Sequence, residues 1–383
     1  MDNENRKNAP GSPDETWGPR KNGQLQAKEV FTANILPDLP VSGTLIFRDG
    51  SMLVSSSVVL TDMHHFSIAK LDSSGNVDKS FGEEGFLTDL FAPGLPAYGG
   101  SFAMKGERIY MFGASKSPSS LDVQIAILCI DETGKRIRDF GTTGQIIVEN
   151  KINDRVFSAD HHFIRTLEDD SLLIGTSGAT GQSRIRTGYL MKFDASGKPV
   201  ASFGSNGIVD IKLPDDAAID LTDVFIFKNG KILVSGYAHK KTSSFNIGLL
   251  VMLNPTGSFN PLFGNDPAIP GFRLFTDKHR GITLSAVTER STDKFLAAGS
   301  IGSLSGSEAL GLLVGFDQRG ENDMAFYEGI AHEVAVSPGH TMGWNAVVTQ
   351  GDDIYVAGGG DVLHSPHSNL TANLIQLLAT KAL

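Results

Sequence analysis

A repeat of about sixty residues is the feature that most constrains this chain. The copies share a turn of the form Asp-x-x-Gly, with Asn in the fourth, then an aromatic residue followed by glycine, with Tyr in the fifth, then a short apolar run. Neighbouring aromatic positions are 59 to 63 residues apart. A steady period of this size indicates one supersecondary unit per copy, with neighbouring units burying a shared core. The aromatic positions are Phe81, Phe140, Phe203, Phe263 and Phe326.

Each period contains four strand-like segments. They are short, apolar or alternating, and bounded by turn residues. Asp49-Gly50 joins the first two segments and favours a tight hairpin, because a type I′ turn needs positive φ at both central residues. Four antiparallel strands in about sixty residues are typical of a β-propeller blade. In the first copy the segments are 44–48, 52–56, 66–71 and 86–90.

The number of blades depends on the two ends of the chain. Five units end near residues 91, 149, 212, 275 and 336, and the last blade, 337–383, stops after three strands. The segment 14–36 matches the missing part, because Trp17-Gly18 corresponds to Phe81-Gly82 and 25–32 supplies a strand. We therefore predict an all-β, six-bladed β-propeller whose N-terminal strand completes the C-terminal blade. Residues 1–13 are expected to form a flexible tail and 14–383 a single domain.

The repeat resembles a known family. The pattern Asp-x-x-Gly followed by Asp-x-x-Phe-Gly-x-x-Gly is similar to the delta-60 repeat, a bacterial β-propeller repeat, and the resemblance covers the chain from Asp14 onward. The chain departs from the pattern at Asn254, at Tyr327 in place of glycine, and in the insertion 267–271. Because the motif consists of turn and packing residues, the resemblance implies the architecture and leaves the activity open.

Composition narrows the choice of partners and location. The chain has 33 Lys and Arg against 43 Asp and Glu, and its net charge of −10 disfavours nucleic acid and anionic membranes. One cysteine, Cys129, excludes an intramolecular disulfide and a multi-thiolate metal site. No apolar run reaches the roughly 18 residues of a membrane span, and the N-terminus lacks the apolar core of a signal peptide. We expect a cytoplasmic monomer, with signal-independent export left open.

Titratable groups point to one face of the predicted propeller. Nine of the ten histidines fall in its inter-blade connections, in the loops after the second strands, or at strand ends beside them. Imidazole and carboxylate groups can ligate metals, and an exposed indole can stack on a sugar or a base, although burial between blades is the alternative for a tryptophan. No cofactor is predicted, but a divalent cation, Ca²⁺ or Zn²⁺, at the channel mouth stays open. The candidate ligand-binding residues are Asp160, His161, His162, Asp223, His279, His340 and Trp344.

Three functions are compatible with these features. The chain has no Gly-x-Ser-x-Gly elbow, phosphate loop or dinucleotide fingerprint, which favours a non-enzymatic scaffold that binds a protein or glycan through its loop-rich face. The alternative is a metal-assisted hydrolase or lyase centred at the mouth of the central channel. A lectin with one pocket per blade is the third, and it is disfavoured because the six outer loops differ in length and composition.

Overall fold

The computed structural model describes residues 18, 27–31, 41–116, 123–148, 151–152, 155–180, 185–241, 245–264, 266–302, 309–334, 343–350, 353–359 and 380–381. The chain divides into two compact units. Unit 1 is made mainly of residues 12–184 and 190–201, and unit 2 mainly of residues 185–189 and 202–383. The predicted single domain stays a prediction. In the described part, no helix is long and apolar enough to cross a membrane.

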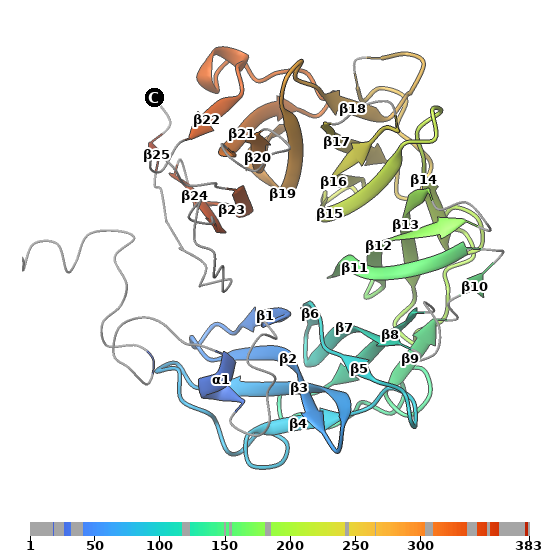
Figure 1. Cartoon of the computed structure of the whole chain (residues 1–383), viewed down its shortest axis with the longest axis vertical. Coiled ribbons are helices and arrows are strands. Elements are labelled where there is room, and N and C mark those ends of the chain that lie inside the picture. Colours follow the sequence, from blue (N-terminus) through green and yellow to red (C-terminus); the bar gives the residue numbers. More distant parts are fainter. Residues whose placement is uncertain are drawn as a thin grey trace, which may run out of the picture. The chain divides into compact units, whose positions relative to one another are not determined.

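The described residues form antiparallel sheets in chain order, labelled in Figure 1. Sheet 1 has the order β1-β2-β3-β4, and sheet 2 the order β5-β7-β8-β9 with β6 also paired to β7. Sheet 3 has the order β10-β11-β12-β13-β14. The bounds are β1 Gly43–Ile46, β2 Met52–Leu60, β3 Met63–Leu71, β4 Phe86–Asp89, β5 Ala97–Tyr98, β6 Phe102–Lys105, β7 Arg108–Lys116, β8 Val123–Ile130, β9 Gln145–Val148, β10 Lys151–Ile152, β11 Arg155–Thr166, β12 Leu172–Thr180, β13 Arg186–Phe193 and β14 Ile208–Ile211.

The remaining sheets lie in unit 2. Sheet 4 has the order β15-β16-β17-β18, sheet 5 the order β19-β20-β21-β22, and sheet 6 the order β23-β24-β25. A 3-10 turn, η2, covers Tyr327–Gly329 and precedes the last strand of sheet 5. The bounds are β15 Ala218–Ile226, β16 Ile232–His239, β17 Asn246–Leu253, β18 Phe272–Phe275, β19 Gly281–Ser291, β20 Lys294–Gly302, β21 Leu310–Asp317, β22 His332–Val334, β23 Gly343–Gln350, β24 Asp353–Gly359 and β25 Thr380–Lys381.

Alternating apolar residues pack the sheets face to face within each unit. In unit 1 one buried cluster joins Leu53 and Phe66 of sheet 1 to Met111 and Leu128 of sheet 2. In unit 2 equivalent clusters join sheet 4 to sheet 5 and sheet 5 to sheet 6. Complete burial of one such side chain contributes roughly 1.5–3 kcal/mol, so these clusters are the main source of stability.

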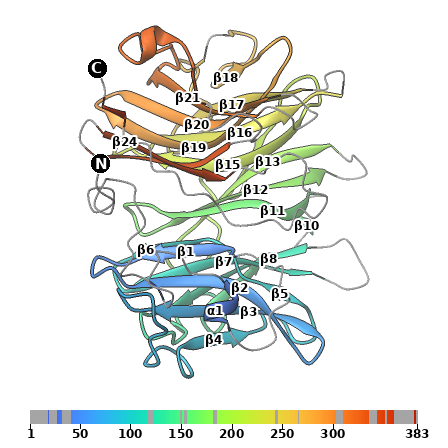
Figure 2. The same ribbon diagram turned by 60° about the vertical axis from the view of Figure 1, so that its left-hand side comes forward.

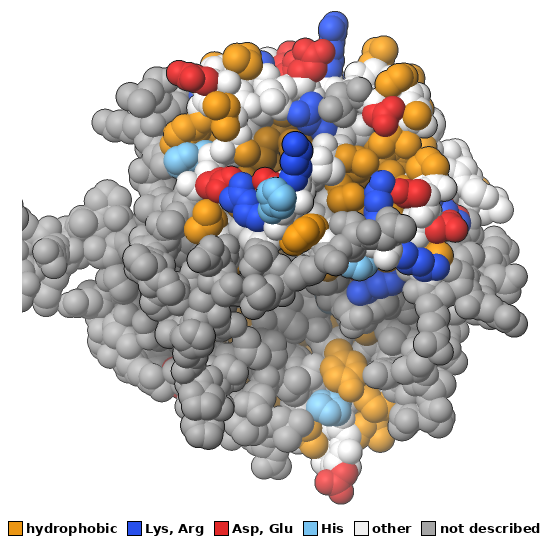
Figure 3. Space-filling model, turned by 45° about the horizontal axis from the view of Figure 1, so that its top comes forward, with side chains coloured by type: hydrophobic (Ala, Val, Ile, Leu, Met, Phe, Trp, Pro, Cys, Tyr) orange, Lys and Arg blue, Asp and Glu red, His pale blue; other side chains and the backbone are white. Residues whose placement is uncertain are grey.

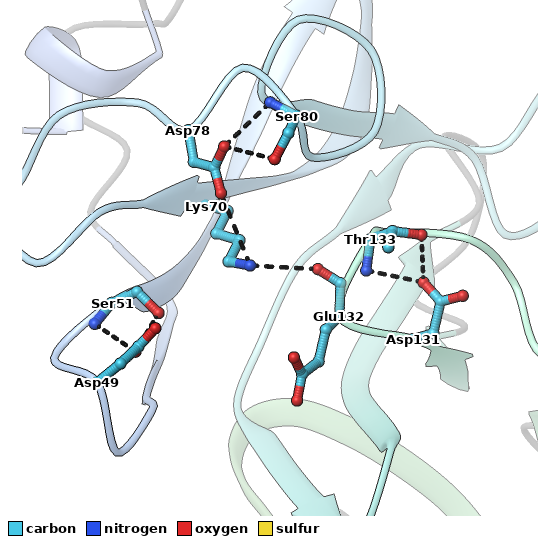
Figure 4. Close-up of polar contacts among 8 residues, drawn as sticks. All are labelled: Asp49, Ser51, Lys70, Asp78, Ser80, Asp131, Glu132 and Thr133. Carbon is cyan, nitrogen blue, oxygen red and sulfur yellow. Dashed lines mark hydrogen bonds and ion pairs between the residues drawn. The ribbon is translucent and has the colours of Figure 1, made fainter.

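The repeat motif forms the joints between neighbouring sheets. The rings of Phe81, Phe140, Phe203 and Phe263 each lie close to the glycine of the following turn, and a Cβ on Gly134 would lie 3.0 Å from the ring of Phe81. The glycine after each of these four anchors, and Gly18 at the N-terminal end, donates its N–H to a carbonyl oxygen of the next turn. Across the joint in Figure 4, the Nζ of Lys70 also lies 3.5 Å from Glu132 O and 3.7 Å from Asp78 Oδ2. The backbone bonds are Gly18→Ser74, Gly82→Thr133, Gly141→Ser196, Gly204→Thr256 and Gly264→Arg319, at 2.8–2.9 Å.

The structure corrects the predicted N-terminal strand. Gly18 bonds to Ser74 as the repeat requires, but a helical turn, α1 Ala27–Val30, replaces the strand expected over 25–32. Val30 and Phe31 are buried against β2 and β3 of sheet 1, beside which Figures 1 and 2 show α1. Ala, Lys and Glu are strong helix formers, which explains the difference. The other predicted closing residues of 14–36 lie outside the described residues, so closure of a six-bladed ring stays a prediction.

In the described part of sheet 1, the loop expected after the second strand is absent. β2 continues to Leu60 and β3 begins at Met63. A tight turn at Thr61 and Asp62, both with positive φ, joins the two strands. His64 and His65, which were expected in a loop over 56–65, therefore lie in β3. The consecutive residues Ser55, Ser56 and Ser57 of β2 are all buried. Buried and exposed residues therefore do not alternate along this hairpin.

Candidate functional site

Irregularities in the first strands of the sheets position the candidate residues. The pairing register shifts between Ser158 and His162 in β11, and between Leu221 and Asp223 in β15. β19 and β23 shift at the equivalent places, and in sheet 2 the strand is interrupted between β5 and β6. A bulge leaves a residue unpaired and re-aims its side chain, and bulges are common beside active sites.

In unit 1 the segment from Tyr98 to Ser101 is the centre of a polar cluster. The carbonyl oxygen of Gly100 accepts a hydrogen bond from Ser55 Oγ at 2.7 Å. A Cβ on Gly100 would lie 2.5 Å from His162 Nε2 and would overlap Phe112, so only glycine fits. The segment therefore brings a serine hydroxyl and an imidazole against the same buried backbone position.

Two histidine rings lie against this cluster. His162 stacks on Phe112 with ring centroids 4.3 Å apart and an interplanar angle of 15°, which fixes the imidazole orientation. His64 lies on Tyr98 at 5.2 Å and 32°, and its Nδ1 is buried with no hydrogen-bond partner among the described residues. An imidazole and a phenol are groups that act in general acid–base catalysis.

In unit 2 two carboxylates flank the bulge of β15. Asp220 is buried and its Oδ1 lies 3.0 Å from Arg186 Nη2. Asp223 is half-buried, and its Oδ2 accepts the backbone N–H of Val287 at 3.2 Å. Between them, the hydroxyl of Thr222 donates to Leu284 O at 2.7 Å. β15 therefore holds two fixed carboxylates of different exposure, one on each side of its bulge.

His279 belongs to a separate ion-pair group in unit 2. It is exposed and lies in the connection between β18 and β19, as predicted. Its backbone N–H donates to Asp277 Oδ1 at 2.9 Å. Arg280 makes 2.6 and 2.8 Å contacts with the two carboxylate oxygens of Glu333. The hydrogen bonds to Glu333 and to Asp277 raise the pKa of the Arg280 guanidinium above its usual value. Asp277 thus acts as a turn residue, as its hydrogen bonds to the backbone show.

The other predicted site residues are divided between burial and the undescribed parts of the chain. Trp344 is completely buried among Leu313, Phe326 and Val356, and its ring fills the space left by Gly311, so it cannot stack on a ligand. Asp160 and His161 lie in β11, but their side chains are outside the described residues. His340 also lies outside them.

No metal centre is found in the residues that the structure describes. Within them, no group of three His, Cys, Asp or Glu side chains could hold a metal ion. Burial raises the pKa of the Cys129 thiol to about 12, so this side chain is a buried apolar group rather than a nucleophile. A divalent cation at the channel mouth stays a prediction.

Sequence reasoning overlooked two groups at these sites. Tyr98 carries no motif, but the following Gly99-Gly100 pair inside a strand-like run signals a bulge and a close backbone approach. Arg186 lies in β13 of sheet 3, and its partner Asp220 lies in β15 of sheet 4. A pairing across two sheets cannot be recognised from the spacing along one strand.

Comparisons with known proteins place the fold. No family model and no curated protein sequence matches the chain. The α-L-arabinofuranosidase Arb93A from Fusarium graminearum, solved with an iminosugar inhibitor, matches at a TM-score of 0.52 and 12% identity over 91% of this chain and 95% of its own. The Penicillium chrysogenum α-L-arabinanase, complexed with arabinobiose, matches at a TM-score of 0.51 and 11% identity over 92% of this chain and 95% of its own. The chain therefore has the fold of a β-propeller built from antiparallel, mostly four-stranded sheets.

These comparisons overturn the prediction of a non-enzymatic scaffold. Both proteins share the fold along about nine tenths of this chain, and both are named as enzymes that act on arabinose-containing carbohydrates. The lack of a sequence motif for catalysis misled the prediction, because in a repeat fold the reacting groups come from different units and leave no contiguous signature.

Proposed function

We propose that this chain is an enzyme that cleaves glycosidic bonds by hydrolysis. The observation that carries the proposal is the likeness of fold, along nearly the whole of both chains, to an α-L-arabinofuranosidase and an α-L-arabinanase. Neutral arabinose-containing glycans are accordingly the first substrates to test. The net charge of −10 fits a neutral substrate better than a polyanionic one.

Asp223 of β15 is the carboxylate to which we assign the chemistry. Most glycoside hydrolases use two carboxyl groups, one that gives or takes a proton and one that acts as nucleophile or activates water. Asp223 is the more exposed of the two carboxylates of β15 and is the one that would contact the substrate, while the hydrogen bond from Val287 fixes its position. Asp220 and its partner Arg186 hold the same strand in place.

The test is hydrolysis of linear arabinan and of a nitrophenyl α-L-arabinofuranoside, followed by the release of reducing ends and of nitrophenol. Asp223→Asn keeps an oxygen that can accept the Val287 N–H but removes the titrating carboxyl group. We expect it to lower kcat by about 10²–10⁴. Asp266→Asn is the matched control, because Asp266 is an exposed turn residue that accepts only a local backbone N–H, from Ala268. Full activity of Asp223→Asn would refute the assignment, and no hydrolysis of arabinan, xylan or galactan would refute the function.

A second candidate reaction, elimination, is favoured by the cluster in unit 1. Cleavage by a lyase needs a base to remove a proton beside a uronic acid carboxylate and an acid to protonate the leaving oxygen, and His64, Tyr98 and His162 are groups of this kind. The two reactions give different products, because elimination leaves a carbon–carbon double bond that absorbs ultraviolet light. Ultraviolet absorbance that grows with a uronic acid polymer, and its loss in His162→Gln, would select the lyase.

A further inference from the structure

The turn before β22 departs from the repeat at a conformationally costly position. The residue after the anchor aromatic is glycine in four other copies, and its φ there lies between +53° and +103°. In the fifth copy Tyr327 has φ +45° and Glu328 has φ +56°. Left-handed backbone costs a residue with a side chain roughly 1–2 kcal/mol, and such strain is concentrated at functional sites. A glycine would remove the cost at position 327, so interactions of the tyrosine ring must offset it.

The ring of Tyr327 packs against two other aromatic rings and stays partly exposed. It stacks on His332 with centroids 3.8 Å apart and an interplanar angle of 7°, and it meets Phe326 edge-on at 4.8 Å and 85°. Phe326 is buried, but 43% of Tyr327 is exposed. Burial lowers the pKa of His332, which keeps its ring neutral near pH 7. The two stacked rings, Tyr327 and His332, are called the aromatic platform below.

Apolar and acceptor groups surround the aromatic platform. Met324 and Ile330 are 70% and 66% exposed, which is unusual for side chains of this size in a turn. Glu328 is exposed, and Arg280 holds the carboxylate of Glu333, the neighbour of His332, in one orientation. Figure 3 shows apolar side chains mixed with acidic, basic and histidine side chains over the described part of this face.

We propose that the aromatic platform binds a neutral polysaccharide chain away from the carboxylates of β15, and so retains the polymer on which the enzyme acts. This rests on the proposed function. A sugar ring has an apolar face of C–H groups and an edge of hydroxyls, which matches a flat ring surface beside fixed carboxylate acceptors. The exposed Glu328 and the net charge of −10 disfavour an anionic polymer, so the ligand is a neutral one.

Affinity electrophoresis through gels containing linear arabinan, xylan or galactan measures polymer binding without turnover. Tyr327→Gly introduces the residue of the other copies, suits a positive φ and removes the ring. We expect its dissociation constant for the retained polymer to rise about fivefold to tenfold. Tyr327→Phe keeps the ring and should bind as the wild type. Leu262→Ala, which removes a 77% exposed side chain from the turn of the preceding repeat, is the matched control and should bind unchanged.

The outcomes separate this proposal from the proposed function. Unchanged retardation of Tyr327→Gly, or no retardation of the wild type by any of the three polymers, overturns the aromatic platform, whether or not short substrates are hydrolysed. Retardation that depends on Tyr327 supports it even when no hydrolysis is seen. A change of oligomeric state in Tyr327→Gly, measured by sedimentation, would identify the surface as a protein interface and would also overturn the proposal.

Discussion

Replacing Gly134 by alanine tests whether the turn glycines and the anchor rings hold the sheets together. Gly134 has φ +84°, and a Cβ there would lie 3.0 Å from two ring atoms of Phe81 and 3.3 Å from the backbone nitrogen of Gly82. That nitrogen donates the joint hydrogen bond to Thr133 O at 2.9 Å. The methyl group therefore meets a buried ring and the N–H that joins the two sheets, and neither can move without opening the joint.

Two costs add in Gly134→Ala. The left-handed backbone costs about 1–2 kcal/mol for any residue with a Cβ. Overpacking at the ring adds about 1–3 kcal/mol. We expect the free energy of unfolding to fall by about 2–5 kcal/mol, which is a large part of the stability of a typical domain.

Gly106→Ala separates the two costs. Gly106 also has a left-handed backbone, with φ +57°, and lies in the same unit, but no atom lies within 4 Å of the position of its Cβ. It should lose only the backbone cost of about 1–2 kcal/mol. The assay is urea denaturation followed by tyrosine and tryptophan fluorescence and by circular dichroism, and stability is compared between the two variants and the wild type. Equal losses in the two variants would refute the packing role of the joint.

Three further predictions use single measurements. A hydrogen bond from the backbone of Asn76 lowers the pKa of Asp72 below its usual 3.8. The stability that the ionised Asp72 contributes is therefore complete above about pH 4 and is lost as the pH falls through the lower, folded-state pKa. A series of thermal melts from pH 6 to 2 checks this. The buried Cys129 thiol, with its pKa near 12, should react with a disulfide reagent at pH 8 only as fast as the protein unfolds, and rapid labelling of the native protein would contradict its burial. Asp220→Asn should cost about 1–3 kcal/mol by removing the negative charge that lies 3.0 Å from Arg186, measured by urea denaturation.

The repeat was sufficient to predict the strands and their packing. The anchor residue is buried in each of the five copies. A large ring that recurs once per unit is buried by packing between neighbouring sheets. The Asp49-Gly50 hairpin forms, with Ile46 paired to Met52, but only Gly50 has positive φ, so the predicted type I′ turn is wrong. Such features depend on neighbours within about ten residues, so the sequence reveals them.

The errors occurred where tertiary contacts decide the conformation. Residues 27–30 were predicted as strand because a closed ring requires one there, but their own helix propensity and the apolar surface of sheet 1 determine the fold of this segment. His64 and His65 were placed in a loop after the second strand, but β2 and β3 continue as a hairpin in which buried serines such as Ser55 bond to a neighbouring sheet. A local signal for polarity cannot distinguish a loop from a strand whose hydroxyls find partners elsewhere.

The candidate chemistry was harder to predict for a physical reason. Whether Asp223 lies at a bulge depends on its pairing with β16, and whether it is fixed depends on Val287, which lies 64 residues away. In a repeat chain, however, every position has equivalents for comparison, and a residue that satisfies the joint carries little information about activity. Tyr327 differs from its equivalents in a way that the joint does not require and the backbone resists. Departures of this kind, rather than the residues that define the repeat, are where the function of such a chain should be sought.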